Sequence, residues 1–456
     1  MRQSTIPPKR QPRLLMLGAS LAQIPGIVAA REQGVHVISC DNLPHSPGHA
    51  LAHESVLAST FDPESVLAAA RQPRIDGIMT MGSDQPVLTA AIVAHQLGLP
   101  SALTVETARA VTDKRVMKKR FLALGLPTVP FVIYQPTESS ADPHILLAPD
   151  RPSPASQTPA APDPLEQLDY PVVIKPVDSQ GQRGIFVCWT AAEVRQKAPK
   201  VLAFSRAAEI LVESYYPSNE VTVSGWVSAG QALILTLTDR ERLAGTDPLG
   251  VCLSHEWPSR YLERHGEEIA SLTQAIVSGF GIAEGPIYFQ FLIGASGVQI
   301  NEIACRIGGA FESQFIPHLT GFNLTAAQID LALGRPISPS NQKALELHDF
   351  RQVREHLSVQ LFFAQPCTIA RLTPLAEVLA CPGVLDAGYH LQIGHTIPAI
   401  TNATARVGYC IVTAPDKRSL EHLLADLYTV LQVIDSTGVN QLIHRPLEVL
   451  PLEGPV

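Results

Sequence analysis

The stretch IYFQFLIGASGVQINEIACRIGGAFE, residues 287–312, carries polar side chains where an ordinary hairpin carries apolar ones. Apolar residues alternate on both sides of a Gly-Ala-Ser-Gly turn, which is typical of a β-hairpin. Gln290 and Glu302 are equally far from the centre of that turn, so we expect them to face each other, with Ala304 and Arg306 on the same face. Such oxygen ligands suit Mg²⁺, and arginine suits bidentate binding of phosphate or carboxylate. A solvated hairpin face with a chance salt bridge is the alternative interpretation.

Two glycine-containing segments could bind an anion through backbone N–H groups. Gly308 and Gly309 follow the hairpin at the start of an expected helix, where N–H groups point outward. Lys175 lies in a strand that Pro176 ends, and a polar loop with two further glycines follows. A lysine beside a small flexible loop suits a polyphosphate, although the P-loop pattern is absent. A glycine-rich hairpin loop with a surface lysine is the alternative.

Two carboxylates flank a turn-rich segment further along the chain. Glu213 ends an apolar strand, the sequence YYPSN follows, and Glu220 precedes the next strand. Carboxylates so placed could accept hydrogen bonds from the amino group and sugar hydroxyls of a nucleotide. Taken alone, the pair is equally compatible with two exposed loop carboxylates.

The elements around these residues form three blocks. Residues 13–110 alternate strand and helix signals, which predicts a doubly wound parallel sheet. Residues 170–335 also alternate strands and helices, and residues 355–456 form a third block. Between the first two blocks, residues 135–168 are rich in Pro, Ala and Ser with little periodicity, which indicates a flexible insertion or linker.

The composition excludes several classes of function. The 456 residues are 46% apolar and 17% charged, which is typical of a globular protein of two or three domains. A net charge of −8 without a basic block argues against nucleic acid or an anionic membrane as a partner. The seven cysteines show no CxxC spacing, so we expect no zinc site or disulfide framework, and a reducing cytoplasm fits best. No apolar run is long enough for a transmembrane helix.

The order of these segments resembles the ATP-grasp superfamily of carboxylate–amine ligases, over residues 13–340. The resemblance implies an N-terminal α/β domain at residues 1–112 and an ATP-grasp domain of two α+β subdomains at 113–340, with the insertion at 135–168. A C-terminal α+β domain at residues 341–456 completes the expected architecture.

The resemblance also implies roles for individual residues toward ATP and Mg²⁺ (or Mn²⁺). Contacts to the phosphates and the adenine end would come from Lys114 and Lys175, with the segment SQGQRG as a mobile loop over the phosphates. The remaining nucleotide contacts would be the loop residues Ser179, Gly181 and Gly184, the adenine hinge Glu213, Ser214, Tyr215 and Tyr216, and the ribose ligand Glu220. Gln290 and Glu302 would hold the metal, and Arg306 would steady the transferred phosphoryl group.

The hairpin departs from the family pattern at one metal position. Many members have Asn where Ala304 stands, and Gln290 replaces a commoner acid. Asn301 is adjacent to Glu302, so strand alternation is expected to turn it to the other face. Two ion sites are therefore expected to depend more on ATP oxygens and water.

Further segments are similar to the L-amino-acid (dipeptide) ligase branch. Residues 237–259 look like its substrate-side segment, with His255 in a catalytic and Glu256 in a substrate role, and the turn at Gly308 and Gly309 looks like its carboxylate-binding turn. Taken alone, a single loop histidine is more often a surface or core-edge residue.

The resemblance implies a ligase that phosphorylates a carboxylate with ATP and lets an amine attack the acylphosphate, releasing ADP and phosphate. Its substrates would be a small-molecule carboxylate and amine, with L-amino acids favoured, and a homodimer is a family-level expectation. Two alternatives are a carboxylase or purine-pathway member of the superfamily and a non-catalytic nucleotide-binding protein. A scaffold acting through the Pro-rich segment is a third.

Overall fold

The structure is a computed structural model, and it describes residues 10–136, 163–243, 251–400, 402–444 and 447–448. Most of the predicted insertion at 135–168 and part of the expected substrate-side segment, residues 244–250, lie outside the described residues. In the part of the chain that is described, no helix is long and apolar enough to cross a membrane.

The N-terminal domain is a parallel four-stranded sheet in the order β3-β2-β1-β4. Its strands are β1 (Arg13–Leu17), β2 (His36–Asp41), β3 (Glu54–Leu57) and β4 (Gly77–Thr80). Its helices and short 3₁₀ turns are η1 (Leu21–Gln23), α1 (Ile24–Glu32), η2 (Pro47–Leu51), α2 (Pro63–Arg71), α3 (Pro86–Leu97) and α4 (Val105–Ala110).

Both faces of this sheet are covered, as a doubly wound fold requires. Leu15 and Leu17 of β1 pack in a core with residues of α2 and α3, whereas Leu14 and Met16 pack in another core with residues of α1 and α9 (Leu324–Ala332). The alternation of β1 therefore buries side chains on both sides, as parallel sheets do. The predicted doubly wound parallel sheet is confirmed.

A second, antiparallel sheet follows in the order β5-β8-β6-β7. It consists of β5 (Phe131–Tyr134), β6 (Val172–Pro176), β7 (Phe186–Cys188) and β8 (Ile210–Ser214). The neighbouring helical elements are α5 (Lys114–Ala123), η4 (Pro164–Gln167) and α6 (Ala191–Leu202). Apolar residues of α6, β6 and β8 form one core, so this sheet is a separately packed layer.

The central nine-stranded sheet has the order β13-β12-β9-β10-β11-β14-β18-β16, with β20 beside β10. Its strands are β9 (Ser218–Ser228), β10 (Gln231–Leu243), β11 (Cys252–Trp257), β12 (Gly285–Gly294), β13 (Gly297–Ala304), β14 (His356–Phe362), β16 (Val384–Tyr389), β18 (Gly408–Ala414) and β20 (Leu447–Glu448). Near it lie α7 (Leu262–Phe280), α8 (Glu312–Thr320) and α10 (Pro339–Leu347). Strands of the third block therefore extend the sheet of the second, with β14 paired to β11.

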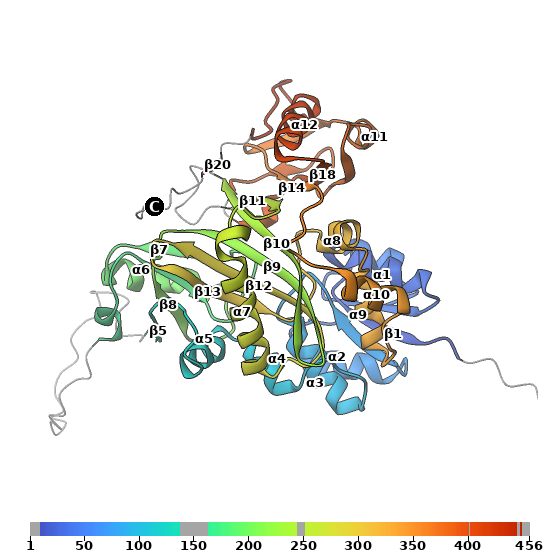
Figure 1. Cartoon of the computed structure of the whole chain (residues 1–456), viewed down its shortest axis with the longest axis vertical. Coiled ribbons are helices and arrows are strands. Elements are labelled where there is room, and N and C mark those ends of the chain that lie inside the picture. The colour runs from blue at the N-terminus through green and yellow to red at the C-terminus, as the bar shows by residue number, and fades with distance from the viewer. Residues whose placement is uncertain (1–9, 137–162, 244–250, 401, 445–446, 449–456) are drawn as a thin grey trace, which may run out of the picture.

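The C-terminal block adds a small sheet and two helices to its share of the central sheet. The small sheet has the order β17-β15-β19, formed by β15 (Cys367–Leu372), β17 (Thr396–Ile397) and β19 (Val433–Asp435). The helical elements are α11 (Leu375–Leu379), η5 (Ala403–Ala405) and α12 (Lys417–Val430). Figure 1 shows this block in red above the central sheet, with the N-terminal domain in blue on the other side.

Candidate functional site

One pocket brings together most of the residues that the sequence singles out. Lys114, Lys175, Ser179, Gly181, Glu213, Ser214, Tyr215, Tyr216, Glu220, His255, Gln290, Glu302, Arg306 and Gly309 all line it. These residues come from α5, from the β5-β8-β6-β7 sheet, from the central sheet and from the loops that follow β6 and β13. Three predicted residues, Gly184, Glu256 and Gly308, do not line the pocket.

The hairpin of β12 and β13 pairs Gln290 directly with Glu302, which confirms the predicted juxtaposition. The turn is one residue tighter than expected, because Gly294 pairs with Gly297 and Phe291 pairs with Ile300. The register then shifts by one residue between Phe291 and Gln290, so Asn301 is the extra residue of a β-bulge. The bulge restores the predicted pairing.

The bulge also makes one prediction wrong, because Asn301 does not turn to the other face. Asn301 lines the pocket next to Glu302, and its side chain lies 3.4 Å from the Lys175 ammonium and 3.5 Å from the Gln290 amide oxygen. Strict alternation fails at a bulge, where an extra residue is inserted into one strand. The amide that the sequence lacks at Ala304 is thus supplied three residues earlier.

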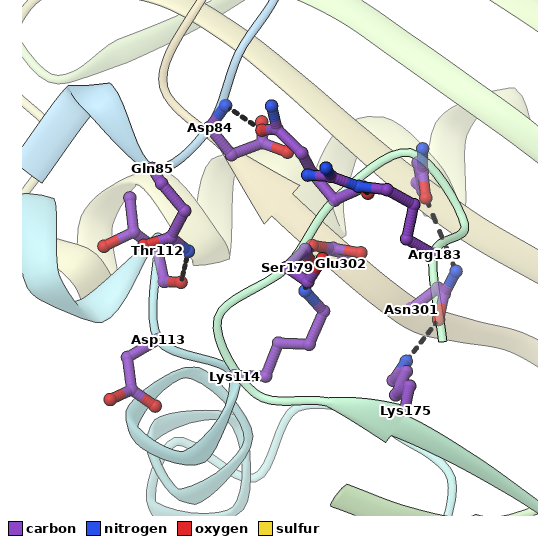
Figure 2. Close-up of polar contacts among 12 residues, drawn as sticks. Asp84, Gln85, Thr112, Asp113, Lys114, Lys175, Ser179, Arg183, Asn301 and Glu302 are labelled. Atoms are coloured by element: carbon purple, nitrogen blue, oxygen red, sulfur yellow. Dashed lines mark hydrogen bonds and ion pairs between the residues drawn. The ribbon is translucent and has the colours of Figure 1, made fainter. Parts of the chain in front are cut away.

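Three buried lysines, Lys114, Lys118 and Lys175, pair with two carboxylates at this end of the pocket. Figure 2 shows Lys114, Lys175 and Glu302. Lys114 lies 2.9 Å from Glu302 and donates to the Ser179 carbonyl at 2.7 Å. The Glu213 carboxylate is held between two lysines, at 2.6 Å from Lys118 and 2.5 Å from Lys175. The cluster has more ammonium groups than carboxylates, so it favours an anion such as a polyphosphate.

The pKa shifts follow from this arrangement. Burial raises the pKa of Glu213, but Lys118 and Lys175 outweigh burial and bring it down to about 2. The pKa of Glu302 is also lowered, since Lys114 and Lys175 outweigh its burial. Burial lowers the pKa of Lys118, and Glu213 only partly offsets that effect. Both carboxylates therefore stay ionised well below neutral pH.

The glycine loop after β6 lies against this cluster. Gly181 and Gly184 have φ angles of +70° and +71°, a left-handed conformation in which a Cβ would be strained. Gly184 packs against the Phe204 side chain and does not reach the pocket, whereas Ser179 and Gly181 do. The loop also contacts the N-terminal domain, because the Gln180 side chain accepts a hydrogen bond from the backbone N–H of Asp84 (Figure 2).

Asp84 is a site residue that sequence reasoning missed. It follows β4, and its carboxylate accepts a hydrogen bond from Nε of Arg306 at 2.5 Å, which fixes the guanidinium across the domain boundary. The Arg306 guanidinium also lies 4.4 Å from the centre of the Tyr288 ring. The signal was present in the sequence: MGSD directly follows the parallel strand β4, and ligands bind outside the carboxyl ends of such strands.

A row of polar side chains crosses the central sheet toward the other end of the pocket. Glu220, Arg240 and His255 are direct cross-strand neighbours on β9, β10 and β11. Glu220 forms an ion pair with Arg240. Burial, with Arg240 and Arg406 nearby, lowers the pKa of His255 to about 3, so its imidazole is neutral at physiological pH. Arg240 and Arg406 were also missed: Arg240 lies within the segment 237–259, where only His255 and Glu256 were singled out, and Arg406 lies in the C-terminal block, where no site residue was predicted.

Glu256 and Gly308 lie outside the pocket for local reasons. Alternation turns Glu256 to the opposite face of β11 from His255, where it accepts hydrogen bonds from Ser254 at 2.6 Å and Gln360 at 3.3 Å. Gly308 packs against the Glu312 carboxyl, whose space a Cβ would occupy. The helix expected directly after the glycine pair begins later, at Glu312, so only Gly309 reaches the pocket.

The residues present fit a Mg²⁺ ion that a nucleotide holds in part. The described residues contain no group of three or more His, Cys, Asp or Glu side chains arranged for a metal. The hairpin instead offers the Glu302 carboxylate with the amides of Gln290 and Asn301 in one pocket. Mg²⁺ is commonly bound by one or two carboxylates, with substrate phosphates and water completing its shell.

Comparisons with known proteins agree with this geometry. A model of the ATP-grasp domain matches residues 168–314, and a model of the L-amino acid ligase C-terminal domain 2 matches residues 360–434. Dapdiamide A synthase of Enterobacter agglomerans is 21% identical over 273 residues, 57% of this chain and 62% of that protein. The chain spans 52% and 62% of the lengths of two curated relatives, so their whole activities do not transfer to it directly.

Two solved structures share the fold over nearly the whole chain. The L-amino acid ligase from Bacillus licheniformis has a TM-score of 0.73 at 19% identity, covering 94% of this chain and 100% of that one. The phosphoribosylglycinamide synthetase from Anaerococcus prevotii has a TM-score of 0.70 at 16% identity, covering 93% and 100%. The resemblance seen in the sequence is thereby confirmed: this chain carries an ATP-grasp domain followed by an L-amino acid ligase C-terminal domain.

Proposed function

We propose that the protein is an ATP-dependent carboxylate–amine ligase that joins L-amino acids through an acylphosphate and releases ADP and phosphate. The observation that carries the proposal is the single pocket in which hairpin oxygens from Glu302 and Asn301 lie with Lys114, Lys175 and Arg306. A carboxylate is a poor electrophile for an amine in water, and phosphorylation gives it a good leaving group. The pocket offers the charges that phosphoryl transfer needs.

In this proposal the buried lysines and the hairpin bind the triphosphate. Lys114 and Lys175 contact phosphate oxygens, and the backbone of Gly181 covers them. Gln290, Asn301 and Glu302 would hold Mg²⁺, which would neutralise charge on the transferring phosphoryl group. The segment from Glu213 to Tyr216, with Glu220, receives the nucleoside. The Ser214 and Tyr215 N–H groups already donate to backbone carbonyls at 2.9 Å, so the adenine contact falls to other groups of this segment.

Arg306 has a different task, because it lies where the phosphoryl group and the substrate carboxylate meet. Asp84 and the Tyr288 ring hold its guanidinium in place before substrate arrives. A carboxylate oxygen attacks the terminal phosphorus, the bond to ADP breaks, and Arg306 stabilises the charge on the transferred group. The amine nitrogen then attacks the carbonyl carbon, the C–O bond to phosphate breaks, the departing phosphate takes up the proton lost by the nitrogen, and an amide forms.

His255 acts by hydrogen bonding in this scheme. With a pKa of about 3 it is a weak base, and it cannot deliver a proton as an imidazolium at neutral pH. Its Nδ1 lies 3.4 Å from the Thr238 hydroxyl, which orients the ring at the pocket wall. We assign it to positioning of the substrate.

We also propose the wider setting of the enzyme. The domains divide at residues 1–112, 113–340 and 341–456. All seven cysteines are free thiols, which supports a cytoplasmic location. The partners are small-molecule substrates, and the assembly is a homodimer.

A purine-pathway activity is the second candidate, because phosphoribosylglycinamide synthetase shares the fold. The C-terminal match to an L-amino acid ligase domain favours the amino-acid ligase. A non-catalytic nucleotide-binding protein would bind ATP without consuming it.

The test is ADP release from Mg²⁺-ATP with pools of L-amino acids, alone and in pairs, with mass spectrometry of the products. We expect substrate-dependent ADP and a product lighter by one water than its two precursors. Lys114→Gln should abolish release, and Lys119→Gln, an exposed lysine on the same helix, should not. Tight ATP binding without ADP release in any pool would contradict the proposal, and bicarbonate and purine intermediates would then be tried.

A further inference from the structure

Arg406 brings a charge from the C-terminal block into the pocket. It follows η5 and precedes β18, and it lines the same cavity as Tyr288, Arg306 and His255. The pairing of β18 with β14, and of β14 with β11, ties its position to the strand that carries His255. The mechanism proposed above assigns no task to this guanidinium.

Arg406 differs from the other cations of the pocket because, within the described residues, it has neither an anionic partner nor a hydrogen-bond acceptor. Its Nε is buried without a hydrogen-bond partner, and within the described residues the side chain forms no ion pair. The neighbouring cations are matched with carboxylates, in the pairs Lys114–Glu302, Lys175–Glu213, Arg240–Glu220 and Arg306–Asp84. Arg183 and Arg242 donate instead to backbone carbonyls, that of Gln180 at 3.2 Å and that of Ser218 at 3.0 Å.

The groups around Arg406 do not neutralise it. Arg240 carries a like charge, and His255 and His390 are neutral because burial lowers their pKa values to about 3 and about 4. The nearby acid is Glu312, whose pKa burial raises and whose carboxylate already accepts the Ala310 N–H at 2.8 Å. Arg406 is half-buried, and its buried Nε has no acceptor. A desolvated donor without a partner is costly, and an anionic ligand would remove that cost.

Arg406 and Arg306 reach the pocket from different elements, because Arg406 precedes β18 and Arg306 follows β13. Arg306 is engaged by Asp84 near the hairpin and the lysines, where the phosphoryl group is expected. Tyr288 lies beside Arg306 and interacts with both guanidiniums. A substrate in the pocket can therefore present one carboxylate to the phosphates and Arg306, and a second anionic group to Arg406.

We propose that Arg406 binds a second carboxylate of the substrates, distinct from the one that is phosphorylated. The inference rests on the proposed ligase function, and it narrows the substrates to a pair that carries such a group. The carboxylate has two sources: the α-carboxylate of the amino acid that supplies the amine, or a side-chain carboxylate of the activated amino acid. Both present the same oxygen pair to the guanidinium.

The experiment measures binding separately from turnover. Isothermal titration calorimetry, with ADP and Mg²⁺ saturating, uses the L-amino acids and their α-carboxamides as probes. Wild-type protein should bind at least one acid in preference to its amide. Arg406→Gln should weaken the binding of that acid by about tenfold or more, because a charge-assisted hydrogen bond is lost, and should leave the affinity for ADP unchanged. The affinity of Arg406→Lys for the acid should lie between the affinities of wild type and Arg406→Gln. The control is Arg418→Gln, which replaces an exposed arginine on α12 and should bind the acid as wild type does.

The probes distinguish the two sources of the carboxylate. Loss of binding when the α-carboxylate becomes an amide identifies the amine-supplying amino acid. Arg406-dependent binding of aspartate or glutamate that survives α-amidation identifies a side-chain carboxylate. Equal binding of acids to wild type and Arg406→Gln, or no preference for any acid over its amide, would overturn the inference.

Turnover separates this inference from the proposed function. If ADP release occurs and Arg406→Gln raises KM for the acid with little change in kcat, both stand. If ADP release occurs with an unchanged KM, the ligase stands and the role of Arg406 is refuted. If no pool releases ADP but binding still depends on Arg406, the anion site stands and the ligase activity is refuted.

Discussion

Replacement of Glu213 by glutamine should lower the stability of the elements around the pocket by a predictable amount. The two lysines that flank this carboxylate lower its pKa from 4.5 to about 2, which corresponds to about 3 kcal/mol of stability at neutral pH. Removal of one member of a buried ion pair costs a similar amount, about 3–5 kcal/mol, because it leaves charges without partners. Glu213→Gln should therefore speed the amide exchange of β8 and α5 roughly a hundredfold at pH 7.

The pH dependence has a definite sign. A carboxyl group with a lowered pKa in the folded state stabilises the protein above its unfolded pKa of 4.5. That contribution disappears as the pH falls from 4.5 toward 2, because the wild-type carboxylate then takes up a proton as well. The difference between wild type and Glu213→Gln should therefore shrink over this interval.

The assay is hydrogen exchange with mass spectrometry, with Glu54→Gln as the matched control. Glu54 also has two partners, Arg13 at 2.7 Å and His36 at 2.8 Å, but its side chain is 47% exposed. An exposed pair contributes less than about 1 kcal/mol, so Glu54→Gln should have a small effect. In the double variant Glu213→Gln with Lys118→Met, part of the lost protection from exchange should return, since both partners of one ion pair are removed. Equal exchange in Glu213→Gln and Glu54→Gln would refute the reasoning.

The remaining predictions concern turnover and the Mg²⁺ requirement of nucleotide binding. Glu302→Ala and Arg306→Ala should each abolish ADP release, by roughly a hundredfold or more, with the fold intact by circular dichroism; full activity in either would refute the site assignment. Asn301→Ala should raise the Mg²⁺ concentration needed for half-maximal nucleotide binding by roughly tenfold, measured by calorimetry, and an unchanged requirement would remove Asn301 from the metal site. His255→Asn should leave the pH profile of kcat/KM unchanged between pH 5 and 8, because a pKa near 3 lies outside that range; a missing acidic limb would show that His255 titrates in turnover.

The sequence predicted the elements of the fold and the pairing at the hairpin, since both rest on local periodicity. The Gln290–Glu302 pair was correct although the turn and the bulge each shift the register by one residue. A bulge leaves no clear mark on apolar alternation, so the position of Asn301 could not be read in this way. Asp84 was readable in principle, because it lies in the loop just beyond the carboxyl end of a parallel strand, β4.

Other features of the site depend on tertiary contacts. The pairing of Lys118 and Lys175 with Glu213 joins a helix to two strands, and nothing in the spacing of these residues indicates it. Arg406 lies 100 positions beyond Arg306 and reaches the pocket only because β18 extends the central sheet. Burial removes the charge of His255, which the sequence alone presents as an ordinary loop histidine.

The measurement that tests the central claim most directly is the fate of the carboxylate oxygen. The activated amino acid is labelled with oxygen-18 in its carboxylate, and the phosphate released during turnover with Mg²⁺-ATP is analysed by mass spectrometry. An acylphosphate transfers one labelled oxygen to each phosphate, and this is the result we predict. Unlabelled phosphate, or label found in AMP, would contradict an acylphosphate intermediate and with it the proposed ligase mechanism.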